Sequence, residues 1–411
     1  VLHYNISMQF KASILLNIIY TSMLLIVCSC SDGILKSDLS HSSLNLDTLK
    51  IEDVLIQNYS VAPSIGSNEK LYLGKKNDIT IPFSFIEISS SPYWNYVYDS
   101  TIIIDSLQFL IYSEDSTLSQ SELPNLYFNP DSQFEENSSH YLDYSGFSLI
   151  DWFKVGKPGL NNILDSSNAF LYTEMVWNID SLLYNLSDTL DSNLFRSFAI
   201  DLDNGETFIE MFSEEASTGD KDPKIVMYYR KTSTVLDSSI IDTTSKIIFS
   251  NGDLSILNSS SIIYNEDTVR LSNGGGIRAV IDIPFTQTSL PEGSLIRSAN
   301  LILPFDTSRS PLPENILFDP IELDSQLVDA TIIHPQDPFD GTGYPYALSI
   351  SPSNGEYIIP VKNILQNIML NNENNSGFKL LSNEKNYPFF YICLTVNQNP
   401  SATRLEIVYG N

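Results

Sequence analysis

The run at residues 201–206, DLDNGE, places four oxygen-bearing side chains around one glycine. Carboxylate and amide oxygens that alternate along a loop before a glycine are the ligands that Ca²⁺ takes in calcium-binding loops. Asp201, Asp203, Asn204 and Glu206 are therefore a candidate calcium site. The distant bidentate glutamate of an EF-hand is missing from its expected place, and Asp, Asn and Gly are also the usual residues of a turn between two strands. Both interpretations stay open.

A second candidate site is aromatic. Residues 93–98, YWNYVY, contain Tyr93, Trp94, Tyr96 and Tyr98. If this segment is extended, Trp94, Tyr96 and Tyr98 share one face, because the side chains of a strand alternate. Aromatic faces stack on sugar rings, so the four residues form a candidate glycan-binding platform. The alternative is that they close the end of a hydrophobic core, because a tryptophan in a long loop tends to be covered.

Catalytic chemistry has little support in the sequence. The chain has four histidines and three cysteines, with no Gly-x-Ser-x-Gly sequence and no Cys/His spacing typical of a metal site. Among its 50 acidic residues nothing singles out the paired carboxylates of a glycosidase. We predict that the protein is not an enzyme, with no catalytic residue and no cofactor other than the calcium considered above.

The charge of the chain bears on its partners. It has 22 basic and 50 acidic residues, a formal net charge of −28 at pH 7. A field of this sign repels phosphate backbones, so we predict no nucleic-acid partner. It also favours solubility and attracts cations as counterions.

The first 30 residues have the form of an export signal. Lys11 precedes an apolar run, Ala12 to Val27, which is short for a membrane-spanning helix. The run ends in Val27-Cys28-Ser29-Cys30, which resembles a bacterial lipobox because a small residue stands directly before Cys30. The resemblance implies that Cys30 is lipidated and that the protein is anchored in the outer membrane or at the cell surface. The alternative is an ordinary signal or a short membrane anchor.

The strands that would position the candidate sites occur in two copies. Short blocks recur in the same order along the chain: 79–83 matches 281–285, 104–109 matches 296–301, 179–186 matches 361–368, 198–200 matches 378–380, and 225–229 matches 405–409. Similarity between two alternating strands is common by chance, but an ordered series of blocks is not. The series favours duplication of a whole module.

Alternation of apolar and polar residues, punctuated by Asn, Asp, Gly and Pro, predicts antiparallel strands. Short helices are predicted only at 180–186 and 362–370. The fold is therefore predicted to be all-β, with two tandem antiparallel β-sandwich, jelly-roll-like domains. The predicted organisation is a signal peptide at 1–29, lipidated Cys30 with a tether at 30–53, module one at 54–230, a linker at 231–245, and module two at 246–411.

Three segments of module two resemble the DNRLRE domain, a β-sandwich family related to carbohydrate-binding modules. They are 281–303, with its Leu-Pro-x-Gly and Ile-x-Ser-Ala-x-Leu sequences, 357–380, with its glutamine followed by Asn-x-Gly-Phe, and the closing strand 404–409. The family's usual tryptophan after the glutamine is Ile368 here, and its basic cluster is not evident. The resemblance implies a cell-surface or extracellular module, of a kind that in some members binds polysaccharide.

These observations predict a non-catalytic cell-envelope lipoprotein whose β-sandwich modules have a structural or adhesive role. Its partners would be the membrane, through the lipid anchor, and a polysaccharide or a surface protein. The alternative hypothesis is a glycan-binding surface lipoprotein that uses residues 93–98. A third hypothesis, a polysaccharide-degrading enzyme, requires two facing carboxylates in a deep cleft. An exposed aromatic row would favour glycan binding, and a buried row would favour the structural role.

Overall fold

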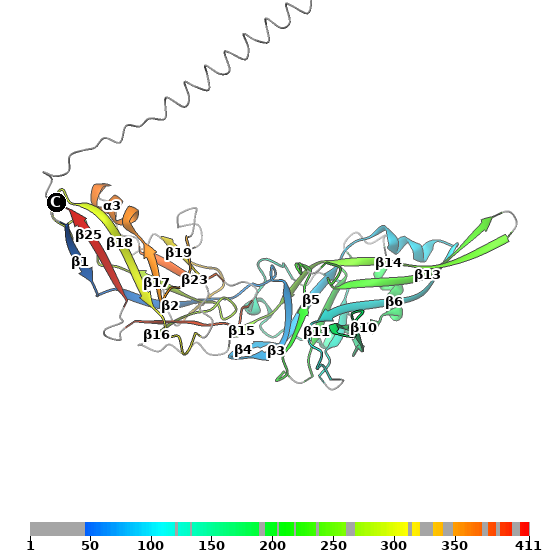
Figure 1. Ribbon diagram of the computed structural model, residues 1–411. Coiled ribbons are helices and arrows are strands. Elements are labelled where there is room, and N and C mark those ends of the chain that lie inside the picture. Colours follow the sequence, from blue (N-terminus) through cyan, green and yellow to red (C-terminus); the bar gives the residue numbers. More distant parts are fainter. Residues whose placement is uncertain are drawn as a thin grey trace, which may run out of the picture. The chain divides into compact units, whose positions relative to one another are not determined.

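The structure, a computed structural model, describes residues 46–119, 122–131, 134–188, 194–203, 205–217, 219–235, 238–259, 268–310, 315–320, 332–339, 348–371, 377–383, 387–396 and 403–410. Strands dominate this part of the chain and pair almost entirely antiparallel, so the all-β prediction is confirmed (Figure 1). Within the described residues, no helix is both long and apolar enough to cross a membrane. Cys30 and Asn204 lie outside the described residues.

The first sheet group is built from residues 70–259. Its large sheet has nine strands in the order β8 (Phe153–Gly156), β7 (Asn125–Asn129), β11 (Ser197–Asp201), β5 (Phe83–Ile88), β14 (Ser238–Ser255), β13 (Lys224–Val235), β6 (Ile102–Ser113), β10 (Phe170–Asn178) and β9 (Gly159–Leu164). Its small sheet has the order β12 (Ile209–Phe212), β3 (Lys70–Lys76), β4 (Ile79–Ile81) and β15 (Asn258–Ser259). Ile86, Phe109, Phe198 and Met227 belong to one buried cluster, so the two halves of the large sheet share a core.

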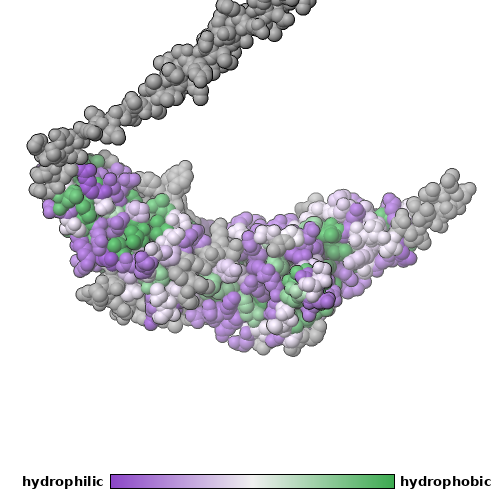
Figure 2. Space-filling view, in the orientation of Figure 1, coloured by the Kyte–Doolittle hydropathy of each residue, from purple (hydrophilic) through white to green (hydrophobic). Residues whose placement is uncertain are grey.

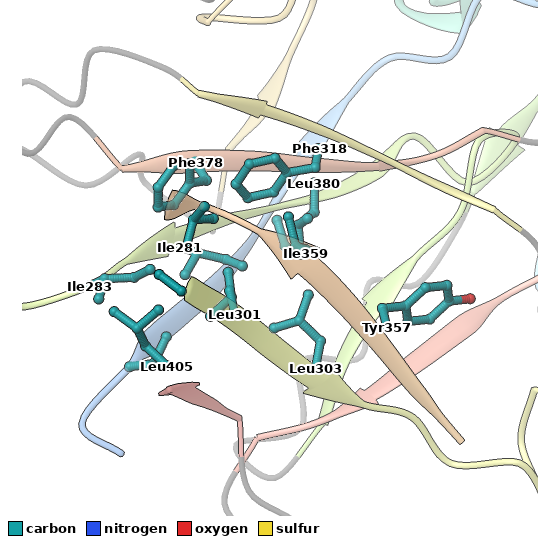
Figure 3. Packing of buried hydrophobic residues seen from close by; sticks show 14 of the residues in the cluster. Ile281, Ile283, Leu301, Leu303, Phe318, Tyr357, Ile359, Phe378, Leu380 and Leu405 are labelled. Atoms are coloured by element: carbon teal, nitrogen blue, oxygen red, sulfur yellow. The ribbon is translucent and has the colours of Figure 1, made fainter. Parts of the chain in front are cut away.

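The second sheet group combines residues 46–61 with residues 268–410. One sheet has the order β1 (Leu46–Ile51), β25 (Arg404–Gly410), β18 (Leu295–Pro304) and β22 (Glu356–Pro360). Another has the order β20 (Ile333–His334), β2 (Leu55–Val61), β17 (Ile277–Asp282), β23 (Phe378–Ser382), β19 (Ile316–Pro320) and β21 (Leu348–Ile350), and a two-stranded sheet pairs β16 (Thr268–Leu271) with β24 (Ile392–Thr395). Ile281 and Phe378 meet Leu301 and Ile359 in its core (Figure 3).

The two predicted helices are present, and the structure adds three short 3-10 helices that the sequence did not predict. The 3-10 helix η5 (Asp180–Leu182) continues into α2 (Leu183–Leu186), and α3 spans Lys362–Asn371. Three further 3-10 helices are η2 (Pro92–Tyr98), η3 (Tyr141–Tyr144) and η4 (Leu149–Asp151). Hydrophilic residues are spread over the visible face of the molecule, as the net charge of −28 leads one to expect (Figure 2).

The repeat is visible in strand register. Trp177 of β10 pairs with Phe109 of β6, and Ile359 of β22 pairs with Leu301 of β18, at the spacing that the sequence blocks predict. In both copies, the residue directly before the following helix also makes the same backbone hydrogen bond. Ile179 N–H donates to the Leu107 carbonyl, and Val361 N–H donates to the Ala299 carbonyl, both at 3.0 Å. The 104–109 and 179–186 blocks are therefore confirmed as structural repeats.

One predicted block is wrong. Strand β23 sets Phe378 opposite Ile281, whereas β11 sets Phe198 opposite Ile86, so the counterpart of Ile281 is Ile86 and not Ile79. Pro82, which has no N–H to donate, separates β4 from β5, and the two strands join different sheets. An alternating Ile-x-Ile-Pro-Phe sequence recurs too easily in strands to fix register by itself.

Strand β14 joins the two halves of the large sheet in the first group. Its first part pairs with β13, with Lys246 opposite Met227, and its last part pairs with β5, with Leu254 opposite Phe85. In the second group this position is shared by two strands, because β1 lies beside β25 and β2 pairs with β17. Strand β14 is thus the counterpart of β1 and β2 together.

Each leading strand consequently belongs to the sheets of the other copy. Strands β1 and β2 precede the first group in the chain but pair in the second, and β14 precedes the second group but pairs in the first. The sequence supports this equivalence, since Ser64-Ile65 and Asn68-Glu69 recur as Ser261-Ile262 and Asn265-Glu266. The same spacing relates Ile56 of β2 to Asp253 of β14. Ile56 pairs with Ile281, and Asp253 pairs with Ile86, the counterpart of Ile281. We call this arrangement the strand exchange.

The predicted module boundaries differ from this pairing. Residues 55–61 of predicted module one pair in the second group, and residues 231–235 and 238–245 of the predicted linker belong to the antiparallel strands β13 and β14, with Val235 opposite Ser238. Thr, Val and Ile are frequent in 231–245 and favour strands, although its Ser and Asp are also typical of linkers.

The strand exchange predicts the effect of deleting residues 46–61. The second group should lose the neighbours of β17 and β25 together with the core side chain of Val54, whereas the first group keeps all its strands. Amide hydrogen exchange should then show lost protection at 277–282 and retained protection at 224–230. A deletion of residues 31–45 serves as the control. Unchanged protection of 277–282 in the 46–61 deletion would contradict the exchange.

Candidate functional site

The aromatic segment does not form an extended strand. Ser91 caps η2, its hydroxyl accepting a hydrogen bond from the Tyr93 N–H at 3.2 Å, and Pro92 occupies the first turn. Proline is favoured there because the first N–H of a helix has no partner within it. Residues 92–98 therefore turn as a helix, and their aromatic side chains do not alternate between two faces of a strand.

Trp94 is a core residue, and its predicted role in an exposed platform is wrong. Its side chain is 0% exposed and belongs to the main cluster of the first group. The indole Nε1 donates to the Ser89 carbonyl at 3.4 Å, and the Arg196 guanidinium lies 5.2 Å from the ring centre. The Arg196 Nε also donates to the Leu186 carbonyl at 2.8 Å, which ties the tryptophan to the end of α2.

The other three aromatic residues have different surroundings. Tyr93 and Tyr96 are half-buried against the same core, and the Tyr96 ring meets Tyr229 of β13 edge-on at 5.1 Å. Tyr98 is 61% exposed. Of the four residues predicted to bind glycan, the structure presents Tyr98 to solvent and uses the others mainly to cover the core.

Trp94→Ala should therefore destabilise the first group strongly. Removal of a fully buried tryptophan costs ~3–5 kcal/mol. Tyr98→Ala provides the matched control and should change the free energy of unfolding by less than ~0.5 kcal/mol, as exposed substitutions usually do. Chemical denaturation of both variants measures the difference. Equal stability of the Trp94 variant and the native chain would restore the platform hypothesis.

The acidic loop is held by amide and ammonium groups. Asn125 Nδ2 donates to Asp201 Oδ1 at 3.1 Å and to Asp203 Oδ1 at 2.9 Å. Lys157 Nζ lies 2.9 Å from the other Asp203 oxygen. The hydrogen bond from Lys157 lowers the pKa of Asp203, whereas burial raises the pKa of Asp201. The structure thus brings Asp201 and Asp203 together, as predicted, around an amide.

The Glu206 carboxylate pairs with Lys75 at 3.6 Å. The fourth predicted ligand, Asn204, lies outside the described residues. Lysine ammonium groups thus neutralise two of the predicted calcium ligands, Asp203 and Glu206. Calcium binding at this loop stays a prediction.

A tighter group of carboxylates was missed by the sequence analysis. Glu136, Glu215 and Asp253 have carboxylate oxygens within 4.8 Å of one another. Asp253, near the end of β14, is 1% exposed. The Glu214 N–H donates to Asp253 Oδ2 at 2.7 Å, and the Asp253 N–H donates to Glu136 Oε1 at 3.0 Å. These three residues are called the acidic cluster below.

The surroundings of the acidic cluster favour the neutral form of its carboxyl groups. Burial raises the pKa of Asp253 well above its usual range, and the neighbouring glutamates add to the effect. Burial, reinforced by Glu136 and Glu214, raises the pKa of Glu215 to about 7. Three close carboxylate oxygens also match the ligands of a hard cation. Since Asp253 is almost fully buried, its carboxylate is not open to a polysaccharide chain as a hydrolytic mechanism would require.

The strand exchange supplies the signal that could have revealed Asp253. Its counterpart in the second group is Ile56, which packs against the core there. An acid in place of a core isoleucine is the type of exception that marks a site or a strained position. Without the equivalence of β14 and β2, Asp253 is one acid among 50 acidic residues.

Asp253→Asn should flatten the pH dependence of stability. Because the pKa of Asp253 is raised in the folded state, the protonated carboxyl group stabilises the fold. That stabilisation is complete below the pKa of the unfolded chain, about 4, and is lost as pH rises through the pKa of the folded state. For Glu215 that loss extends to about pH 7. Thermal unfolding at pH values from about 4 to about 8 should show a smaller fall for Asp253→Asn than for the native chain.

The matched control for that titration is Glu292→Gln, which removes an exposed acid. It lowers the total negative charge by the same amount and so corrects for general repulsion in this acidic chain. Identical pH profiles for Asp253→Asn and Glu292→Gln would show that the acidic cluster is not the source of the pH dependence.

These features define an all-β protein with two sheet groups that repeat one strand order. No family model matches the chain, so its resemblance to the DNRLRE domain stays a prediction. No curated protein matches it either. Among solved structures, a biofilm associated protein, B domain, is similar at 11% identity over 84% of this chain and 76% of that chain, with a TM-score of 0.17.

Proposed function

We propose that this protein is a non-catalytic, lipid-anchored protein of the cell envelope, in which two β-sandwich domains joined by the strand exchange have a structural or adhesive role. The strand exchange is the observation that carries the proposal. Strand β14 pairs with β13 over twelve positions and with β5 over five. Separation of the copies would break these pairs or those of β1 and β2, so the exchange couples the two sheet groups mechanically.

The N-terminal strand is also well placed to take a load. In the proposed mature protein, residues 31–45 connect the lipid on Cys30 to β1, which lies beside the C-terminal strand β25. A pull on the tether therefore acts on a paired strand of the second group before it reaches the first group. A spacer or adhesin at the outer membrane or cell surface, in contact with a polysaccharide or a surface protein, needs such resistance.

The glycan-binding hypothesis loses its original support at residues 93–98. Trp94, the residue with the largest surface for stacking, is 0% exposed. Of the four aromatic residues of this segment, Tyr98 is the exposed one. The structural role is therefore the function that the geometry of this segment favours.

Lipid anchoring is tested by Cys30→Ala, with Cys28→Ala as the matched control. In the proposed protein only Cys30 follows a small residue, Ser29, so Cys30→Ala should release the chain from the membrane fraction or leave an uncleaved precursor. Cys28→Ala should fractionate as the native chain does. Cell adhesion should fall for Cys30→Ala and should not fall for Cys28→Ala. Processing and fractionation of Cys30→Ala that match the native chain would contradict the anchor.

A further inference from the structure

A pocket of about 520 Å³ lies beside the pair of β16 and β24. Arg270 of β16 stands opposite Cys393 of β24 in register, and both line the pocket. The remaining lining residues are aromatic, cationic, anionic or amide side chains: Phe389, Phe390, Tyr391, Arg309, Asp78 and Asn77. A pocket of this size accommodates one or two sugar units, since small-molecule sites measure ~300–1,000 Å³.

The aromatic wall is fixed by packing. Phe389 is 5% exposed and meets the ring of Tyr72 edge-on at 4.8 Å. The Asn77 side-chain amide donates to the Phe389 carbonyl at 3.0 Å, and the Gly274 N–H donates to the Pro388 carbonyl at 3.0 Å. These contacts hold residues 388–391 before any ligand arrives. A wall in place beforehand lowers the entropy cost of binding.

Arg270 gives the pocket a positive charge, which faces the negative charge of Asp78 in the same lining. Its guanidinium lies 5.8 Å from the ring centre of Tyr391 and forms no ion pair with a carboxylate among the described residues. Arg230, Arg278 and Arg404, by contrast, are all in ion pairs.

The other polar groups of the pocket complement that charge. Arg309 pairs with Asp306 at 3.4 Å, but its side chain is 51% exposed and can turn toward a ligand. Burial raises the pKa of Tyr391 to about 12, so its ring is a neutral phenol at physiological pH. Asn77 and Asp78 are exposed at the pocket and offer hydrogen bonds to hydroxyl groups.

We propose that this pocket binds a saccharide unit that carries a carboxylate, the chemistry of a uronic acid in an acidic polysaccharide. Guanidinium groups bind carboxylates through two parallel hydrogen bonds. The aromatic wall stacks on the apolar face of the sugar ring. Asn77 and Asp78 bind its hydroxyls.

This site is separate from the lipid anchor and from the strand-exchange argument for a structural role. The proposed binding holds whether or not Cys30 is acylated. A failure to bind saccharide would leave the structural role standing, and a soluble Cys30 variant would leave the binding site standing.

The test is calorimetric titration of the full-length protein in detergent micelles. The probes are a trigalacturonic acid and its fully methyl-esterified form, which keeps the rings and removes the charges. The acid should bind, and the ester should bind at least ~10-fold more weakly, the range for loss of a charged hydrogen bond. No binding of the acid at millimolar concentration, or equal binding of both forms, would overturn the proposal.

Variants assign the binding to this pocket. Arg270→Gln should weaken binding of the acid about 10–100-fold and leave binding of the ester nearly unchanged. Arg270→Lys keeps the charge but not the planar fork, so it should lose less. Arg297→Gln, an exposed arginine on β18, is the matched control.

Melting temperatures recorded alongside separate a loss of binding from a loss of fold. If Arg270→Gln does not fold, Arg270→Lys and Tyr391→Phe carry the test, and Tyr391→Phe should keep binding because the ring remains. Native affinity in a folded Arg270→Gln variant would overturn the assignment.

Discussion

The structure depends on the backbone hydrogen bonds that β14 makes along both of its edges. One edge pairs with β13 over twelve positions and the other with β5 over five, so the strand closes two half-sheets into one. Without β14, both halves would expose an unpaired edge, which is a template for aggregation. In the second group the same constraint is met by β1 and β2, which are interrupted by residues 52–54. The second group closes with β1 and β2, which precede the first group in the chain, and the first group closes with β14, which corresponds to those leading strands.

The two groups differ in the buried carboxylate that lies on or beside the leading strand, β14 in the first group and β2 in the second. In the second group Tyr59 of β2 donates its hydroxyl to Asp337 at 3.2 Å, and Asp337 is paired with Arg278 and Lys379. Burial alone would raise the pKa of Asp337, but the two cations and the Phe339 N–H lower it. The carboxylate is therefore ionised and compensated, and its ion pairs strengthen as its proton is lost.

In the first group the leading strand carries Asp253, whose neighbours Glu136 and Glu215 are acids as well. Burial and the neighbouring glutamates both favour the neutral form of Asp253. The stability of the two copies thus responds to pH in opposite directions near related strands. Ionisation of the paired Asp337 stabilises the fold, and ionisation of Asp253 destabilises it.

The sequence correctly predicted the strand register and the helix positions that short-range patterns determine. Leu107 and Phe109 alternate with polar residues, and their match to the second copy holds in strand register and in the hydrogen bond that follows. The two short helices are also where the repeated blocks place them. The match at Ile79 failed because alternation has period two and tolerates many alignments, and only pairing with β11 identifies Ile86 as the counterpart.

Other features lie beyond local patterns. The burial of Trp94 depends on Arg196 and on the end of α2, about a hundred residues away in the chain, although Ser91-Pro92 is a recognisable helix start that argues against an extended platform. Arg270 and Tyr391 are 121 residues apart in the chain (391 − 270) and meet only in the folded protein. The strand exchange cannot be read from repeated blocks, because a strand shows the same alternation whether it pairs within its own copy or in the other.

The strand exchange and the pocket meet in one small buried cluster. Ile65 and Leu257 follow the two exchanged strands, β2 and β14, and both pack in a cluster with Tyr72 and Phe389. Phe389 is also the buried end of the aromatic wall of the pocket. The side chains that cover the two crossing segments therefore hold the wall against which a sugar ring would stack. Because Tyr72 and Asn77 come from one sheet group and Phe389 and Arg270 from the other, the pocket requires both copies. Duplication without exchange would supply the same residues but not the segments that bring them together.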